Sequence, residues 1–224
     1  MLRIVVAACC IALTLAACGG GGDNDPEPPP DATPALDANN CRAVEAPAPK
    51  DGEASEPSDT ELDAAKTYVA TVKTNCGDFE ITLDAERAPK TTASFKSLAD
   101  QRFYDGTTFH RIVPDFVIQG GDPRGDGTGG PGYSVREKPP EDLKYEIGVV
   151  AMAKAGDEPA GTSGSQFFVV TGPQAAELPP DYALVGTVTG GQPVVEKIGA
   201  ILTDPRTDLP EAPVVIESIR VSER

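Results

Sequence analysis

The chain has 224 residues and carries 35 aspartates and glutamates against 19 lysines and arginines, so its net charge at pH 7 is −16. This acidic balance does not attract phosphate backbones, which argues against nucleic acid as a partner. One histidine, and five cysteines without zinc-site spacing, indicate that there is no metal site.

The first 18 residues have the pattern of a secretory signal: Arg3 precedes an apolar run over 4–15, and small residues precede Cys18. The run is too short to span a bilayer. The sequence LAAC at 15–18, followed by a glycine run, resembles a bacterial lipobox. That resemblance implies a signal peptide over 1–17, a lipid on Cys18, and export to the outer face of the cytoplasmic membrane in the cell envelope. An ordinary signal peptide cut nearby is the alternative.

Residues 18–65 are predicted to form an acidic tether. From Gly19 to Ala65 there are 12 acidic residues, 2 basic residues, 8 prolines and no aromatic residue. Such a segment buries too little apolar surface to offset its ordering entropy, so we expect a solvated spacer. Cys41 and Cys76 are the cysteines left after export and lipidation, and they are candidates for one disulfide that would pin the spacer near Cys41. Two unpaired thiols are the alternative.

Residues 66–224 suffice for one domain with one sizeable core. A hairpin is predicted over 67–84, and a helix of about 12 residues is predicted within 88–103. Further elements are predicted in chain order: strands at 107–113, 116–119, 147–154, 165–172, 183–189 and 212–221, and a second helix at 192–201. Many short strands with glycine-rich connections indicate a barrel or a sandwich.

Two glycine-rich loops carry incomplete motifs. GDGTGG at 125–130 matches a dinucleotide-binding pattern, but Pro131 follows where a helix should begin. GTSGSQ at 161–166 approaches a serine-nucleophile elbow, but Ser165 stands where that motif needs glycine. Neither loop therefore predicts a dinucleotide cofactor or a serine hydrolase.

Three segments resemble the cyclophilins, a family of peptidyl-prolyl cis-trans isomerases. They are FHRIVPDFVIQGGDPRGDGTGG at 109–130, VAMAKAGDEPAGTSGSQFFV at 150–169 and DYALVGTVTGGQPVVEKI at 181–198, and weaker similarity extends over 67–222. The resemblance implies a mainly β fold, a closed eight-stranded antiparallel barrel capped by two α-helices. It also implies isomerisation of X-Pro bonds with no cofactor.

The family's catalytic arginine falls on Arg111. Strand alternation places Phe109, Arg111 and Val113 on one face, and His110 and Ile112 on the other. The resemblance and the alternation together give catalytic roles to Arg111, Phe116 and Gln119, and substrate-binding roles to Val117, Ala153, Lys154, Ala155, Gln166, Phe168, Leu178 and Tyr182. The sequence departs from well-known members at Tyr182, where many have histidine, and at Lys154, where many have asparagine.

His110 and Asp122 are interpreted as structural. We expect His110 to point away from Arg111 with its nitrogens hydrogen-bonded under the pocket, and Asp122 to accept hydrogen bonds from loop amides or an arginine. No proton transfer is needed, because amide rotation breaks no bond.

The leading interpretation is a monomeric, lipid-anchored isomerase that acts on proline-containing peptides and unfolded exported proteins. Two alternatives stay open: a proline-recognising binding module or chaperone with little turnover, and a purely structural envelope protein. Exchange of a proline peptide between its isomers separates them, since only an enzyme accelerates it.

Overall fold

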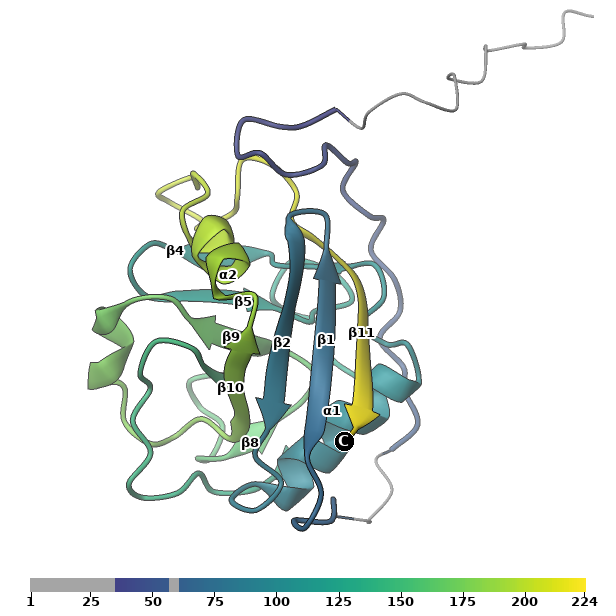
Figure 1. The fold of residues 1–224 in the computed structure, drawn as a ribbon, viewed down its shortest axis with the longest axis vertical. Helices are drawn as coiled ribbons and strands as arrows, with labels where there is room; N and C mark the ends of the chain where they lie inside the picture. Colours follow the sequence, from purple (N-terminus) through teal and green to yellow (C-terminus); the bar gives the residue numbers. More distant parts are fainter. Residues whose placement is uncertain (1–34, 57–60) are drawn as a thin grey trace, which may run out of the picture. The chain divides into compact units, whose positions relative to one another are not determined.

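A computed structural model describes residues 35–56 and 61–224 (Figure 1). The expected signal peptide at 1–17 and the expected lipid anchor on Cys18 lie outside these ranges. No helix among the described residues has the length and apolar character needed to cross a membrane.

Antiparallel strands make up most of the regular secondary structure among the described residues, together with two α-helices and one 3-10 helix. The helices are α1 (Pro89–Asp100), η1 (Pro173–Glu177) and α2 (Gln192–Gly199). The strands are β1 (Tyr68–Thr74), β2 (Gly77–Leu83), β3 (Thr107–Thr108), β4 (Arg111–Val113), β5 (Val117–Gly120), β6 (Val135–Arg136), β7 (Val149–Met152), β8 (Thr162–Ser163), β9 (Phe167–Val170), β10 (Leu184–Gly190) and β11 (Val215–Glu223).

The predicted hairpin and both predicted helices are confirmed. β1 pairs with β2 from Val69–Thr82 to Thr74–Gly77. Helix α1 begins at Pro89, where a missing amide hydrogen costs nothing, and its residues Phe95, Leu98 and Ala99 are buried at the predicted helical spacing. In Figure 1 the two α-helices lie at opposite ends of the curled sheet.

The expected closed eight-stranded barrel is wrong. The main sheet has nine strands in the order β3-β11-β1-β2-β10-β7-β9-β5-β4 and forms a curled half-barrel, with β3 and β4 at its two edges. The strand predicted over 107–113 is divided at Phe109 and His110. Its first part pairs with β11 and its second part pairs with β5, so the ladder has a seam at that point.

The same seam corrects the predicted alternation. Phe109 does not share the face of Arg111; it is fully buried in the main core, as is Ile112, and its ring meets Phe167 edge-on at 5.9 Å. Beyond the seam the alternation returns. Ile112 points into the core, whereas Arg111 and Val113 stay half-buried on the opposite face.

Apolar residues cover both faces of the central strands. The main core lies inside the curl and includes Ile118 of β5 and Phe167 and Val169 of β9. A smaller cluster lies on the outer face, and its members are Ala88, Val117, Leu143, Tyr145, Ala151, Phe168, Val170, Ala175 and Leu184. Val117 and Phe168 of this outer cluster form the floor of the site described below.

Residues 35–56 of the expected tether contact the domain, and we call this segment the strap. The Lys50 amide donates to the Pro123 carbonyl at 3.1 Å, and the Ala54 amide donates to the Pro131 carbonyl at 3.1 Å. Gly52 allows this close approach, because a Cβ there would lie 2.1 Å from the Gly130 carbonyl oxygen. The strap thus differs from a solvated spacer: backbone hydrogen bonds hold it where apolar residues are lacking.

A disulfide joins Cys41 of the strap to Cys76 in the turn between β1 and β2. The Arg42 amide donates to the Asn75 carbonyl at 2.8 Å next to it. Figure 1 shows the strap passing from this turn down the side of the molecule beside β11. The hairpin and the glycine-rich loop are therefore both attached to the strap.

Candidate active site

One row of paired residues crosses the outer face of the sheet. Arg111 of β4 pairs with Gln119 of β5, Gln119 pairs with Phe168 of β9, and Phe168 pairs with Ala151 of β7. Residues paired in this way point to the same side of a sheet. The row places a cation, an amide and an aromatic ring side by side.

A cavity of about 190 Å³ opens over this row. Nine predicted site residues line it: Arg111, Phe116, Val117, Gln119, Ala153, Lys154, Phe168, Leu178 and Tyr182. Ala155 and Gln166, which were also predicted, line a neighbouring hollow instead. The structure therefore brings the predicted residues together in two adjoining depressions that share Gln119, Ala153 and Lys154.

The guanidinium of Arg111 is held on two sides. Its Nε donates to Oδ2 of Asp208 at 3.1 Å, and its Nη1 donates to Oε1 of Gln119 at 3.5 Å. The Arg111 side chain is 38% exposed and that of Asp208 is 35% exposed, so solvent weakens their attraction. The contacts therefore direct the group more than they stabilise the fold.

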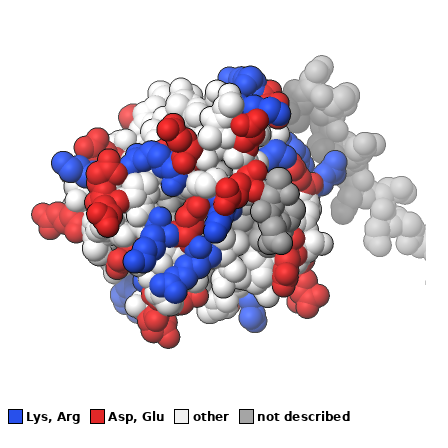
Figure 2. Space-filling view, turned by 90° about the horizontal axis from the view of Figure 1, so that it is seen from below, with Lys and Arg blue, Asp and Glu red and all other residues white. Residues whose placement is uncertain are grey.

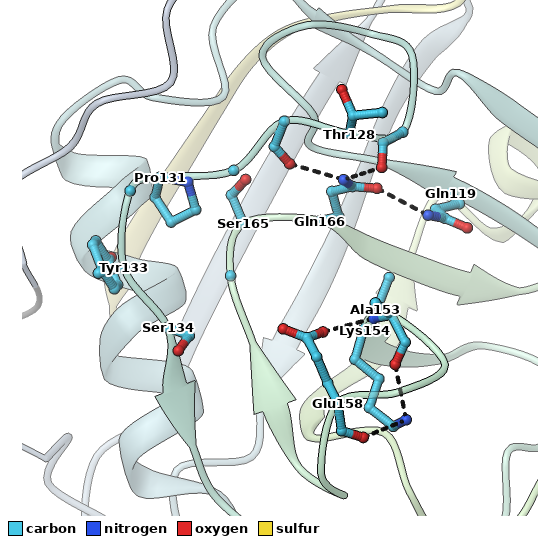
Figure 3. A pocket seen from close by; sticks show the side chains of 16 residues that line it. Gln119, Thr128, Pro131, Tyr133, Ser134, Ala153, Lys154, Glu158, Ser165 and Gln166 are labelled. Atoms are coloured by element: carbon cyan, nitrogen blue, oxygen red, sulfur yellow. Dashed lines mark hydrogen bonds between the residues drawn. The ribbon is translucent and has the colours of Figure 1, made fainter.

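A chain of side-chain amides continues from Arg111 into the glycine-rich loop (Figure 3). Gln119 Nε2 donates to Gln166 Oε1 at 3.0 Å, and Gln166 Nε2 donates to the carbonyls of Gly127 and Gly129 at 3.0 and 2.9 Å. Because both Gln166 donors face carbonyls, its oxygen is left to accept from Gln119. The Gln119 oxygen is then left to accept from Arg111.

Asp122 anchors the glycine-rich loop, as predicted. Its fully buried carboxylate accepts hydrogen bonds from the amides of Arg124, Asp126 and Gly127 at 2.6 to 3.1 Å. Gly129 has to lack a side chain, because a Cβ there would lie 2.1 Å from Oδ1 of Asp122. The loop that receives Gln166 is therefore held from below.

The neighbouring hollow has a volume of about 550 Å³. The glycine-rich loop borders one side, and the turn after Ala153 borders the other (Figure 3). In that turn the Glu158 carboxylate accepts from the Ala155 amide at 2.6 Å, and Lys154 Nζ donates to the carbonyls of residues 155 and 158. The cavity over Arg111 is the better candidate for the reaction, because it joins an apolar floor to a permanent cation.

Aromatic rings form the rim of the cavity opposite Arg111. Tyr182 meets Phe168 edge-on at 5.4 Å, and Tyr145 lies 5.9 Å from Tyr182. Lys154 Nζ lies 5.7 Å from the centre of the Tyr182 ring. Tyr182 and Lys154, the two departures from well-known cyclophilins, thus contact one another.

His110 is buried next to the seam, away from the cavity. Burial lowers its pKa, and the negative charge of Asp122 partly opposes that effect. The expected hydrogen bonds are wrong: neither ring nitrogen has a protein partner of ordinary geometry within the described ranges. The ring therefore occupies space in the core and takes no part in the row of Arg111.

Two residues of the site were not predicted. Asp208 lies 97 positions from Arg111, in the loop between α2 and β11, where no strand or helix periodicity predicts a neighbour. Tyr145 donates from its hydroxyl to the Tyr182 carbonyl at 2.7 Å. Tyr145 lies outside the strands and helices, so no periodic pattern in the sequence indicated its role. Residues 35–56 and 61–224 contain no cluster of three or more potential metal ligands.

Comparison with known proteins places the chain in a family. The family model described as cyclophilin type peptidyl-prolyl cis-trans isomerase/CLD matches residues 69–221. The chain belongs to this family. Peptidyl-prolyl cis-trans isomerase B of Streptomyces anulatus is 44% identical over 178 residues, which are 71% of this chain and 99% of that protein. Peptidyl-prolyl cis-trans isomerase A of Mycobacterium tuberculosis is 41% identical over 174 residues, covering 70% and 93% of the two chains.

Solved cyclophilins share the fold of this one. A cyclophilin type isomerase of Cryptosporidium parvum superposes with a TM-score of 0.65 at 28% identity, covering 70% of this chain and 99% of that chain. A structure of the same protein in the presence of the dipeptide Ala-Pro gives a TM-score of 0.64 at 29% identity. The chain is a peptidyl-prolyl cis-trans isomerase of the cyclophilin type.

Figure 2 shows one face of this cyclophilin, on which acidic and basic side chains are interspersed. Ion pairs at the surface of the protein include Arg220 with Asp105 at 2.6 Å and Lys96 with Asp100 at 2.6 Å. Each such pair contributes little to stability on its own.

Proposed function

We propose that this cyclophilin isomerises X-Pro bonds by using Arg111 to stabilise the twisted amide. Rotation about the peptide bond is slow because resonance gives it a barrier of about 18–20 kcal/mol. At the top of that barrier the prolyl nitrogen is pyramidal and carries a lone pair. A guanidinium that donates to this lone pair favours the twisted state over both planar isomers, and that difference is catalysis.

The contact pattern of Arg111 is the observation that carries the proposal. Asp208 and Gln119 occupy Nε and Nη1, and the guanidinium stands at the edge of a cavity with an apolar floor. A proline ring on Val117 and Phe168 would bring its nitrogen to that edge. Arginine suits this role because it stays charged and presents its donors in a rigid plane.

The remaining cavity residues receive supporting roles. Phe116, Leu178 and Tyr182 would enclose the proline ring, and Gln119 would orient the arginine. The turn at Ala153–Ala155 would bind the backbone of the peptide, with Lys154 using main-chain atoms. Gln166 would serve from the adjoining hollow by holding Gln119 in place.

Exchange NMR on an Ala-Pro peptide tests the role of Arg111. Arg111→Ala should lower kcat/KM at least tenfold, because a charge-assisted hydrogen bond of about 1.5–3 kcal/mol is lost. Arg111→Lys should restore little of it, since an ammonium cannot hold the same donor geometry. His110→Gln is the matched control, because it changes the neighbouring residue without touching the cavity. A folded Arg111→Ala variant with the wild-type exchange rate would refute the mechanism.

We further propose that the enzyme works outside the cytoplasmic membrane as a lipid-anchored monomer, assisting the folding of exported proteins. The LAAC sequence at 15–18 and the disulfide between Cys41 and Cys76 support this location, because disulfides persist in oxidising compartments. Cys18→Ser should move the protein from the membrane fraction to the soluble fraction. Mass spectrometry that finds an unmodified mature N-terminus elsewhere would overturn the anchor.

A further inference from the structure

We infer that Asp208 is a positioning residue for catalysis: it holds the Nε edge of Arg111 and so aims the outer nitrogens of the guanidinium into the cavity. This inference rests on the proposed role of Arg111. It adds a residue from the loop between α2 and β11, outside the three segments 109–130, 150–169 and 181–198 that carry the strongest family resemblance.

The loop that carries Asp208 is built to hold it in place. The Asp208 carbonyl accepts from the Ile112 amide at 2.9 Å, which binds the loop to strand β4 beside Arg111. The Asp208 amide donates to the Asp204 carbonyl at 2.8 Å, and the Asp204 amide donates to the Leu209 carbonyl at 2.9 Å. The amide and the carbonyl of Asp208 are thus both hydrogen-bonded. These bonds fix the position of its backbone, from which the carboxylate extends toward Arg111.

The backbone of Asp208 has a φ of +59°, in the left-handed region. Glycine adopts this region freely, and asparagine and aspartate adopt it more readily than other residues. Glycine or asparagine would therefore fit the backbone at this position as well as aspartate does. The carboxylate has to be explained by its contact with Arg111, which is the only salt bridge that Arg111 makes among the described residues.

Holding Nε determines where the rest of the guanidinium points. The group is planar, so a contact on Nε and a second contact on Nη1 together define its plane. Nη2 has no protein partner in the part of the chain that the structure describes. It is the donor that a twisted prolyl amide can use. Without Asp208 only the long contact to Gln119, at 3.5 Å, would restrain the side chain.

The charge of Asp208 has an opposing effect that has to be weighed. A carboxylate beside the guanidinium lowers the positive potential that the prolyl nitrogen meets. Both side chains are more than one-third exposed, so solvent screens this effect, whereas the direction of the hydrogen bond persists. We therefore expect that orienting the guanidinium raises the rate more than partial neutralisation of its charge lowers it. Removal of Asp208 should then slow the enzyme.

The experiment compares Asp208→Gly with Asp115→Gly in the full chain. Asp115 is a matched control: it is an exposed aspartate with a φ of +57° in the turn between β4 and β5, and it does not line the cavity. Both variants lose one negative charge and both gain backbone freedom, but only Asp208 contacts Arg111. We expect kcat/KM to fall about fivefold in Asp208→Gly, mainly through kcat, and to stay near wild type in Asp115→Gly.

Asp208→Asn keeps a neutral acceptor on the same backbone and should recover part of the loss. The Nε–H signal of Arg111 in a ¹H–¹⁵N spectrum should shift in Asp208→Gly and stay in place in Asp115→Gly. If Asp208→Gly does not fold, Asp208→Asn with this signal provides the test. Arg111→Ala is measured alongside, so that failure of the proposed mechanism is recognised by its own result.

Equal rates in the two glycine variants, with Arg111→Ala inactive, would overturn the role of Asp208 and leave Arg111 as the catalyst. A faster Asp208→Gly enzyme would also overturn it, because neutralisation would then be the larger effect. A wild-type rate in Arg111→Ala would refute both the catalytic role of Arg111 and the positioning role of Asp208.

Discussion

The hydroxyl of Tyr145 bonds twice to the backbone of Tyr182: it donates to the carbonyl at 2.7 Å and accepts from the amide at 2.9 Å. One buried side chain thus supports the aromatic rim of the cavity from behind. Because the two bonds act on a single residue, they fix both the position of Tyr182 and the direction in which its ring extends.

Tyr145→Phe should loosen this rim. Two hydrogen bonds to a partly buried backbone are lost, so we expect the free energy of unfolding to fall by about 1–3 kcal/mol. The KM for a proline peptide should rise while kcat changes less, because Arg111 lies on the opposite side of the cavity. Urea unfolding and exchange NMR measure the two effects. Tyr133→Phe, which loses one contact of 3.3 Å to Ser94, is the control and should change neither value as much.

Stability should decline at alkaline pH. Burial raises the pKa of Tyr145 to about 12, and burial also raises the pKa of Tyr104. A tyrosine in the unfolded chain releases its proton near pH 10, so the folded state binds more protons between about 10 and 12. The contribution to stability is complete below pH 10 and is lost as the pH rises toward 12. Urea unfolding at pH 8 to 11 should show this fall, with a shallower slope in Tyr145→Phe.

The chain has a single histidine, so the titration of His110 can be followed by NMR without overlap from other imidazoles. Burial lowers the pKa of His110, so the folded state takes up its proton at lower pH than the unfolded state, whose value is about 6.5. The stabilising contribution is present above pH 6.5 and is lost as the pH falls through the folded value. NMR of the one imidazole should give a folded pKa below 6.5. A value at or above 6.5 would contradict the burial of an uncharged ring.

His110→Gln extends this test to activity. We expect the variant to lose stability, because the ring fills space beside the seam, and to keep most of its rate per folded molecule. Its free energy of unfolding should depend less on pH between 4 and 7 than that of the wild type. A folded variant that loses turnover would assign the histidine a part in the reaction.

Reduction of the disulfide should destabilise the fold. Cys41 and Cys76 are 35 positions apart, and closing a loop of that size stabilises a protein by about 3–4 kcal/mol in the chain-entropy model. The melting temperature should therefore drop on addition of a reductant, and the Cys41→Ser, Cys76→Ser variant should show the lower value without it. Two free thiols titrated in the unfolded, non-reduced protein would show that the bond does not form.

The row of site residues could be predicted from the family resemblance combined with the two-residue repeat of a strand. The resemblance placed Arg111 in the site, and alternation within short, regular strands then indicated the faces of Gln119 and Phe168. The same rule failed at Phe109, because the chain changes partner strand there and the core takes a bulky ring that alternation assigns to the other face. No local pattern marks such a change of partner.

The contacts of Asp208 and of the strap could not be predicted from the periodic pattern of the sequence. Asp208 lies in a loop whose shape depends on its own backbone hydrogen bonds, and its contact spans 97 positions. Composition correctly indicated that residues 35–56 bury few apolar side chains. It could not indicate that main-chain hydrogen bonds to Pro123 and Pro131 would hold them against the domain.

The disulfide has a mechanical consequence for a chain attached at its N-terminal end. Tension applied ahead of residue 41 would pass through the covalent bond into the turn between β1 and β2, because the bond is the shorter and stiffer route. Residues 42–75 would then form a loop that carries no load. The contacts of the strap with the glycine-rich loop lie within that unloaded segment, so a pull on the N-terminal end would leave the support of Gln166 undisturbed.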